Sequence, residues 1–487
     1  MCVVCGNFSH IALDGLGETG TDSAASLGSI PQLANYLVNG YWQFNNTIAH
    51  HWGSNTITFN LGNLTAAEQS LALAALNAWD DVANIKFVQS TSANINFNHD
   101  GSQKAFAQAS WTSAGIMTSC TVDISSDWAG GAGTGFDSYL YQTYIHEIGH
   151  ALGLGHQGPY NGSAKYGVDN IFTNDTWQFA VMSYNSQENF DSGSYRFVLT
   201  PQMSDITAIQ SIYGAASTRT GDSIYGFNSN AGFPYNFSSF GKAPAWTIYD
   251  SGGFDTLDAS GYSNNQGITL APGGFSNIGG LVHNIGIFTT TIIERALGGS
   301  GHDFIVGNEA ANILHGNGGN DTLFGGGASD AVYGNIGNDV IYGNIGIDAV
   351  FGGQNDDLVF GGQDNDHVYG NLGNDNIYGN LGNDSLFGGQ GNDRLFGGQG
   401  NDNLSGNLGN DTYFGGLGAD TYAFTVSSGT DIVMDFNFGA GDRLSVFGQS
   451  RSVSTASDGS ALVTLSGGGS VQLFGVSASS VTDSYFV

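Results

Sequence analysis

The stretch HEIGHALGLGH at residues 146–156 has the pattern H-E-x-x-H-x-x-G-x-x-H. On a helix, residues four positions apart share one face, so His146 and His150 direct two imidazoles toward the same point. Gly153 can take the positive φ that ends a helix, and His156 then adds a third imidazole from outside it. Three neutral nitrogen ligands leave a fourth position open on a zinc ion. The stretch therefore predicts a zinc site.

Glu147 follows the first histidine and is placed to reach the space beside the zinc. Water bound at the open position becomes acidic enough to ionise near neutrality, and a neighbouring carboxylate can accept its proton. The pattern predicts metal-assisted hydrolysis with one catalytic Zn²⁺, held by His146, His150 and His156, and with Glu147 as the base. A helix that carries these residues without a metal is the alternative.

A second element, Ala-Val-Met-Ser-Tyr at 180–184, lies downstream of His156. Together the two elements resemble the serralysin branch of the metzincin metalloproteases. The resemblance implies that Met182 forms a Met-turn, an apolar floor under the zinc. It also implies that Tyr184 is an additional zinc ligand that swings away and assists catalysis. A packed core tyrosine is the alternative for Tyr184.

The composition excludes several classes of partner. The 487 residues contain 10 Lys and Arg against 42 Asp and Glu, a net charge of −32, which repels nucleic acid and anionic lipid. No apolar stretch reaches the length of a membrane span. The start of the chain lacks the basic region and apolar core of a Sec signal peptide. Three cysteines, Cys2, Cys5 and Cys120, do not make a disulfide framework.

Residues 31–215 are expected to form the catalytic domain. Thr65 and Glu68 make a capping box for a helix that continues through AAEQSLALAALNAW. Thr200 and Pro201 are expected to start a later helix that stops at Gly214. Alternating apolar residues predict short strands. The resemblance to metzincins implies that the strand before the zinc helix is the cleft edge that pairs with substrate. That strand comprises Ala105, Phe106, Ala107, Gln108, Ala109, Ser110 and Trp111.

Residues 298–423 form 14 consecutive rows of nine residues, each opened by Gly. The rows follow the G-G-x-G-x-D-x-U-x pattern of RTX proteins, which folds as a parallel β-roll. Stacked turns bring the position-six carboxylates together around hard cations, so several structural Ca²⁺ ions are expected. Position six is Asn312 in one row and Asp in the other 13: Asp303, Asp321, Asp330, Asp339, Asp348, Asp357, Asp366, Asp375, Asp384, Asp393, Asp402, Asp411 and Asp420.

Position nine of the rows is aromatic in 10 of the 14, which leaves two interpretations open. The rings either stack as a structural ladder or form an adhesive surface for a partner or a polysaccharide. Stacking is the favoured interpretation. The array is also longer than the family needs, so the extra rows stiffen a stalk or attach the enzyme to a surface.

The expected fold is an α+β metzincin catalytic domain followed by an all-β, calcium-binding parallel β-roll with a C-terminal β-cap. The boundaries are a leader or propeptide at 1–30, the catalytic domain at 31–215, a lead-in β segment with calcium sites at 216–297, the roll at 298–423, and the cap at 424–487. The ending Asp483-Ser-Tyr-Phe-Val487 is similar to the uncleaved signal of type I exporters in Gram-negative bacteria.

The resemblance runs from about residue 30 to the end, through WDDVANIKF (79–87), DITAIQSIYG (205–214) and RTGDSIYGFNSN (219–230). It implies lead-in calcium ligands at Arg219, Gly221, Ser223, Asp250, Gly252, Gly253, Asp255 and Glu294. Two features depart from the family. Gln157 stands where serralysins commonly have Pro, which affects the primed-side pocket. Cys2 and Cys5 are either exposed leader thiols or a latency device in which a thiolate occupies the open zinc position.

These observations predict a secreted zinc-dependent endopeptidase that acts on protein or peptide substrates outside the cell and leaves through a type I secretion apparatus. A proteinaceous inhibitor and a cell-surface layer are further expected partners, with no nucleic acid and no membrane span. The alternative function is a surface-layer or adhesion-associated RTX binding protein whose protease domain processes one partner or is inactive.

Overall fold

This computed structural model describes residues 25–100, 105–125 and 135–487. The chain divides into two compact units, Met1–Ser217 and Thr218–Val487, which are described separately. Within the described residues, every helix is too short or too polar to cross a membrane. Cys2 and Cys5 lie outside the described residues, and Cys120 is a buried free thiol.

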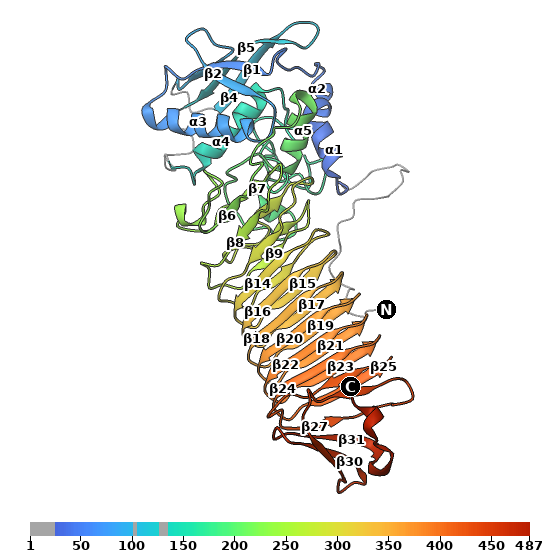
Figure 1. Cartoon of the computed structure of the whole chain (residues 1–487). Helices are drawn as coiled ribbons and strands as arrows, with labels where there is room; N and C mark the ends of the chain where they lie inside the picture. The colour runs from blue at the N-terminus through green and yellow to red at the C-terminus, as the bar shows by residue number, and fades with distance from the viewer. Residues whose placement is uncertain (1–24, 101–104, 126–134) are drawn as a thin grey trace. The chain divides into compact units, whose positions relative to one another are not determined.

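The first unit is built on a five-stranded sheet in the order β2-β1-β3-β5-β4 (Figure 1). The strands β2, β1, β3 and β5 pair in parallel, whereas β4 runs antiparallel to β5 at the edge of the sheet. The strands are β1 (Thr56–Asn60), β2 (Lys86–Gln89), β3 (Ile95–Asn98), β4 (Ala105–Trp111) and β5 (Met117–Ile124). The helices are α1 (Ile30–Asn35), η1 (Tyr36–Gly40), α2 (Tyr41–Phe44), α3 (Ala66–Asp80), α4 (Tyr139–Ala151), η3 (Gln187–Asn189) and α5 (Met203–Tyr213). The predicted strand at 105–111 is thus found as an edge strand.

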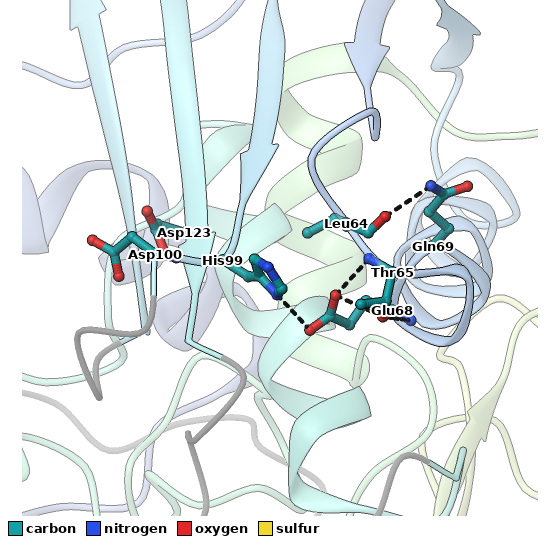
Figure 2. A network of polar contacts seen from close by, with 7 residues as sticks. All are labelled: Leu64, Thr65, Glu68, Gln69, His99, Asp100 and Asp123. Atoms are coloured by element: carbon teal, nitrogen blue, oxygen red, sulfur yellow. Dashed lines mark hydrogen bonds and ion pairs between the residues drawn. The ribbon is translucent and has the colours of Figure 1, made fainter.

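The predicted capping box of α3 is confirmed, and it also contacts the sheet (Figure 2). Glu68 Oε2 accepts from the Thr65 backbone N–H at 2.7 Å, while Glu68 Oε1 lies 3.1 Å from Nδ1 of His99, just after β3. Burial alone would raise the pKa of Glu68, but the hydrogen bonds from Thr65 and His99 lower it below its usual value. One carboxylate therefore fixes both the start of α3 and its place beside β3.

The helix that carries the zinc motif, α4, begins at a Ser138 cap and ends at Ala151. Gly153 follows with φ 105°, as the motif requires, and a side chain there would collide with the His50 carbonyl. The cap expected for the last helix was wrong: α5 begins at Met203, and its capping box pairs Gln202 with Asp205 rather than using Thr200.

The second unit is a parallel β-roll whose strands alternate between two sheets (Figure 1). One sheet has the order β28-β26-β24-β22-β20-β18-β16-β14-β12-β8-β6, and the other has β29-β30-β31-β27-β25-β23-β21-β19-β17-β15-β13-β9. The lead-in strands are β6 (Ile224–Gly226), β7 (Trp246–Ile248), β8 (Thr256–Asp258), β9 (Gly267–Thr269), β10 (Phe275–Ser276), β11 (Ile285–Ile287) and β12 (Arg295–Leu297). Here β10, β11 and β7 form a separate small sheet.

The repeat rows supply one strand each: β13 (Phe304–Val306), β14 (Ile313–Gly318), β15 (Thr322–Gly326), β16 (Ala331–Ile336), β17 (Val340–Ile345), β18 (Ala349–Gln354), β19 (Leu358–Gln363), β20 (His367–Leu372), β21 (Asn376–Leu381), β22 (Ser385–Gln390), β23 (Arg394–Gln399), β24 (Asn403–Leu408), β25 (Thr412–Leu417) and β26 (Thr421–Ala423). Position eight of each row is fully buried and forms the core between the sheets. This alternation of inward and outward residues is what a period of two in a strand predicts.

The aromatic residues at position nine stack along both sheets. Ring centroids of neighbouring strands lie 4.5 to 4.9 Å apart, with planes within 18° of parallel, from His315 to Phe387 on one sheet and from Phe324 to Phe396 and Phe414 on the other. The rings therefore form the structural ladder that the sequence favoured.

After residue 423 the chain continues with β27 (Thr430–Val433), β28 (Arg443–Ser445), β29 (Arg451–Thr455), β30 (Ser460–Leu465) and β31 (Ser470–Ser477). β27 pairs with β31 in parallel, and β30 pairs antiparallel with both β29 and β31. The Tyr485 ring stacks on Phe438 near the C-terminus, and Arg451 covers Phe486. The closing role of this segment as a cap stays a prediction.

Candidate metal centres

Three histidines from α4 and the turn after it converge in the first unit. His146, His150 and His156 each offer one ring nitrogen, and these nitrogens all lie within 4.8 Å of one another. Each Nδ1 is 2.8 Å from a backbone carbonyl oxygen: that of Val181 for His146, Leu154 for His150 and Tyr160 for His156. Because a carbonyl can only accept, Nδ1 carries the proton in each ring, and Nε2 is left as the free nitrogen.

This arrangement fits a tetrahedral zinc. Nε2 of His150 and Nε2 of His156 are 2.9 Å apart. Two nitrogens bound to one zinc at about 2.05 Å would lie about 3.3 Å apart. Burial lowers the pKa of His146 to about 4 and that of His150 to about 3, and it lowers the pKa of His156 well below its usual value. All three imidazoles are therefore neutral at physiological pH, which is the form that binds metal.

Glu147 follows His146 on α4 and reaches the edge strand β4 through the backbone N–H of Ala107. The side chain is buried, and its Oε2 has no hydrogen-bond partner. Burial raises the pKa of Glu147 to about 8, opposed in part by the backbone N–H of Ala107 on β4. At this pKa the group is mostly protonated near neutrality, and the charge of a metal bound by the three histidines would favour the carboxylate form that a general base for a metal-bound water requires.

The predicted Met-turn lies directly beneath α4. Met182 is fully buried, and a Cβ at Gly149 would sit 2.5 Å from its Sδ. The preceding residue, Val181, accepts from His146 and donates its N–H to Asp205 Oδ2 on α5 at 2.6 Å. These two hydrogen bonds hold the turn between α4 and α5. Because Met182 approaches α4 so closely, there is no room for a side chain at Gly149.

Tyr184 lies against two of the histidines. Its ring centroid is 4.5 Å from that of His156 and 5.7 Å from that of His146, and its hydroxyl accepts a 3.4 Å hydrogen bond from the Gly162 N–H. Burial, the largest of several effects, raises the pKa of Tyr184 to about 12, so the hydroxyl stays protonated as a donor. The hydroxyl is thus held by a weak contact beside the metal site.

A buried polar network that sequence reasoning missed ties these parts together. Asp175 Oδ1 accepts from the Tyr160 hydroxyl at 2.9 Å and from Ser183 Oγ at 2.7 Å. The Tyr160 hydroxyl in turn accepts from the Tyr184 N–H at 3.3 Å, while the Tyr160 carbonyl holds His156. One carboxylate therefore links the third histidine's loop to the Met-turn and to Tyr184.

Beyond Ala107, the edge strand leads to an aromatic wall. Trp111, at the end of β4, is 37% exposed and stacks on His50, with ring centroids 3.9 Å apart and planes 2° from parallel. Trp42 also packs against His50, with ring centroids 4.3 Å apart, and donates to the Gly153 carbonyl. The outward edge of β4 has no neighbouring strand among the described residues.

Gln157, which replaces the Pro common in the family, is also fully buried. Its Nε2 donates to the Leu33 carbonyl of α1 at 3.0 Å. The departure thus anchors α1 against the third histidine's loop.

In the second unit, the position-six aspartates form two continuous columns. From Asp321 onward, each Oδ1 accepts from the backbone N–H of the residue at position six one turn earlier, as Asp339 does from Asp321 at 2.7 Å. Each Oδ2 from Asp321 to Asp420 is buried and without a hydrogen-bond partner. Burial raises the pKa of these groups, to about 7 for Asp321. Rows of unpartnered carboxylate oxygens in oxygen-rich turns fit Ca²⁺.

The first member of the array differs from the others. Both oxygens of Asp303 accept backbone N–H groups, from Gln266 at 2.6 Å and from Gly299 at 2.5 Å. Asn312, the exception at position six, likewise accepts from the Asn308 N–H. The turns from Asp321 onward, where one carboxylate oxygen is unpartnered, are therefore better suited to bind cations than the first turns at Asp303 and Asn312.

In the lead-in segment, three of the predicted calcium ligands come together. Glu294 Oε2 accepts from the Asp255 N–H at 2.7 Å, and burial together with the charges of Asp250 and Glu294 raises the pKa of Asp255 to about 7. Asp255 Oδ2 has no hydrogen-bond partner. Gly253, with φ 150°, packs directly on Gly221, whereas the Arg219 side chain donates to the Tyr249 carbonyl. A calcium role for this group stays a prediction.

Three family models match the chain in succession. Residues 51–163 match the model described as Matrixin, and residues 214–336 match the Peptidase M10 serralysin C terminal. Four copies of the RTX calcium-binding nonapeptide repeat match at 333–368, 351–386, 360–395 and 387–422. In these three segments the chain is similar to the serralysin-type metzincins. The Matrixin match implies a catalytic zinc and the RTX repeat matches imply structural calcium, for which the histidines and the aspartate columns provide fitting donors.

The curated proteins that the chain resembles are named as metallopeptidases or serralysins. The chain is 38% identical to Metallopeptidase AprA of Pseudomonas marginalis over 267 residues, 51% of this chain and 56% of the relative. It is 39% identical to Serralysin B of Dickeya chrysanthemi over 260 residues, 50% and 53% of the two chains. It is 36% identical to Serralysin of Proteus mirabilis over 268 residues, 50% and 54%. The chain thus spans about half the length of the curated relatives that it matches.

Proposed function

We propose that this chain is a secreted zinc-dependent endopeptidase that hydrolyses peptide bonds of extracellular proteins. The observation that carries the proposal is the buried, unpartnered carboxylate of Glu147 beside three neutral imidazoles whose Nε2 atoms converge. Proteins and peptides in extended conformation are the proposed substrates.

In the proposed mechanism, zinc, when bound, polarises the scissile carbonyl and acidifies water. The carbonyls of Val181, Leu154 and Tyr160 hold the histidines in the tautomer that exposes Nε2. Glu147 takes the proton from the attacking water at its free Oε2 and later delivers it to the leaving amine. The Tyr184 hydroxyl turns from Gly162 and donates to the developing oxyanion of the substrate.

The edge strand β4 orients the substrate in this proposal. A substrate backbone that pairs with Ala105–Trp111 is held by main-chain hydrogen bonds, which are indifferent to side-chain identity. The exposed Trp111 ring, supported by His50, then favours an apolar or aromatic side chain at one subsite. Hydrolysis is thereby directed to unfolded or flexible segments.

In this proposal, residues 31–215 carry out catalysis and residues 216–423 bind calcium. The carboxylates of the array, together with Asp250, Asp255 and Glu294, bind calcium outside the cell. Low free calcium inside a bacterium leaves the roll unfolded for a type I secretion apparatus, and residues 424–487 form the cap that carries its recognition signal. An inhibitor protein and a cell-surface layer are proposed as additional partners.

The alternative, an adhesion protein with an inactive protease domain, is not favoured. Loss of function would be expected to remove Glu147 or a histidine ligand first, and His146, His150 and His156 are all present.

The test compares Glu147→Gln with Glu188→Gln, a matched change at an exposed carboxylate. Glu147→Gln should keep one zinc per chain and lower kcat for casein or a quenched peptide by at least about 100-fold, the scale of losing a general base. Glu188→Gln should behave as wild type. Activity of Glu147→Gln within a few-fold of wild type, with zinc bound, would overturn the proposed role.

A further inference from the structure

The loop Ser427–Asp431 lies beyond the last repeat row, yet it has the backbone of an array turn. Ser427 has φ 65°, as Asn407 has φ 67° at position two of the last complete turn in this column. A Cβ at Gly429 would lie 1.7 Å from the Gly409 carbonyl oxygen, just as one at Gly409 would lie 1.5 Å from that of Gly391. The loop therefore occupies positions two to six of one more turn.

The side-chain ladders also continue into this loop. The Asp411 N–H donates to Asp431 Oδ1 at 3.0 Å, which extends the aspartate column. The Thr430 N–H donates to Asn410 Oδ1 at 2.9 Å, which repeats the bond from Asn410 to Asn392. In the array these bonds join residues 18 apart, whereas here they join residues 20 apart. Two extra residues before this loop shift it out of phase with the nine-residue repeat, so the repeat pattern does not include this additional turn.

Two oxygen atoms in this turn lack a complete hydrogen bond. Asp431 Oδ2 and Ser428 Oγ make no geometrically complete hydrogen bond, although the two residues are 0% and 1% exposed, and the Ser428 hydroxyl is close enough to the Asp431 carboxylate to lower its pKa. Ser428 lies beside the Asp431 carboxylate, and Asp411 Oδ2, one turn earlier, is likewise unpartnered. At the equivalent position three, Leu408 is 46% exposed. This turn therefore buries a side-chain oxygen at the position where the preceding turn of the column exposes Leu408.

We propose that Asp431, Ser428 and Asp411 hold a further calcium ion outside the nonapeptide repeats. Carboxylate and hydroxyl oxygens, completed by turn carbonyls, are the hard ligands that Ca²⁺ takes. Without a cation, burial and the charge of Asp411 raise the pKa of Asp431 to about 7, which is consistent with an uncompensated buried carboxylate.

The other column ends differently and provides a control. Asp442 Oδ1 accepts from the Asp420 N–H at 3.1 Å, but its Oδ2 accepts from the Asn437 N–H at 2.7 Å. Asp442 is buried like Asp431, and both of its oxygens are satisfied by the backbone. It terminates its column without an oxygen left for a metal.

The proposed site also connects the roll to the C-terminal strands. β27, which contains Asp431, pairs with β31 from Thr430–Ser470 to Val433–Leu473. The Ser470 N–H donates to the Gly429 carbonyl at 2.8 Å, and the Ser427 N–H donates to the Gly467 carbonyl at 3.1 Å. A Cβ at Gly469 would sit 2.5 Å from Ser428 Oγ. Calcium here would therefore order the turn on which the last strands assemble.

The test uses the full chain and measures calcium rather than proteolysis, so it is independent of the proposed peptidase. Bound calcium per chain is counted after equilibrium dialysis at fixed free calcium, and hydrogen exchange is followed over β31. Asp431→Asn should bind one calcium ion fewer than wild type and speed exchange of β31 at least about 10-fold at intermediate calcium. Ser428→Ala, which leaves the Asp411–Asp431 hydrogen bond in place, should weaken one calcium site. Asp442→Asn should bind as many ions as wild type.

Two results would overturn the site. One is an Asp431→Asn protein that binds as much calcium as wild type. The other is an equal loss in Asp431→Asn and Asp442→Asn, since that would reflect a general loosening of the end of the roll.

Discussion

Removing calcium should make the stability of the roll depend on pH in an unusual direction. In the calcium-free roll, burial, reinforced by neighbouring carboxylates, raises the pKa of Asp321 to about 7 and that of Asp357 and Asp366 to about 8. These values lie above the value of about 3.9 for an unfolded chain. The stabilisation is therefore fully present below pH 4 and is lost as the pH rises through 6 to 8.

The size of the effect follows from these shifts. A rise of three to four pKa units corresponds to roughly 4–5 kcal/mol for each carboxylate that must ionise in place. One such group is already comparable to the lower end of the roughly 5–15 kcal/mol that stabilises a whole domain, and the coupled columns contain twelve carboxylates from Asp321 to Asp420. The calcium-free roll is therefore expected to be folded in acid and unfolded above neutrality.

The measurement uses the full Glu147→Gln chain, which is expected not to digest itself. Far-UV circular dichroism is recorded from pH 4 to 9 in chelator, with hydrogen exchange over 298–423, corrected for pH, to assign the change to the roll. The β signal should disappear between pH 6 and 8 in chelator and persist in millimolar calcium. Magnesium should restore it poorly, since it prefers a tight octahedral shell with retained waters. A calcium-free roll that is as protected at pH 8.5 as at pH 4.5 would refute this reasoning.

The other predictions concern single side chains. Tyr184→Phe should keep zinc and lose about 1–3 kcal/mol of transition-state stabilisation, so an unchanged kcat/KM would make Tyr184 a packing residue only. Tyr160→Phe removes the hydroxyl between Asp175 and the Tyr184 N–H but leaves the carbonyl that holds His156, so zinc affinity should stay within a few-fold while kcat falls. Its loss should not add to that of Tyr184→Phe in the double variant, and full additivity would show that the two residues act separately. Gly391→Ala should lower the Tm of the calcium-loaded roll by several degrees, because its Cβ would meet the Gly373 carbonyl oxygen at 1.6 Å, whereas Gly459→Ala, also at positive φ but with open space around it, should cost much less.

The features that the sequence predicted are those in which spacing alone determines geometry. Helical periodicity places His146 and His150 on one face, and the nine-residue period fixes which side chains stack. The capping box of Thr65 and Glu68 is equally local. In each case the residues that matter are separated by a constant number of positions, so no tertiary information was needed.

The features that it missed depend on segments brought together by the fold. Asp175, Tyr160 and Ser183 come from three loops with no common spacing, and an Asp that follows Asn174 in a loop is otherwise an ordinary turn residue. Asp431 was missed for a different reason: the sequence Ser-Gly-Thr-Asp-Ile-Val preserves the G-x-D-x-U pattern of a row but is displaced by two residues. A search that allows such displacement would have found it.

The alternation of the roll between two sheets sets the unit in which its length can change. Main-chain and side-chain ladders join residues 18 apart, so each full turn contacts only the turns before and after it. Excising 18 residues would shorten the roll by one strand spacing, about 4.8 Å, and bring equivalent surfaces together. Excising nine would exchange the two faces for everything downstream, including the column that ends in Asp431 and the one that ends in Asp442. Insertions or deletions that preserve the roll are therefore expected in multiples of 18 residues. Only such changes keep each sheet and each aspartate column joined to its own ending at Asp431 or Asp442.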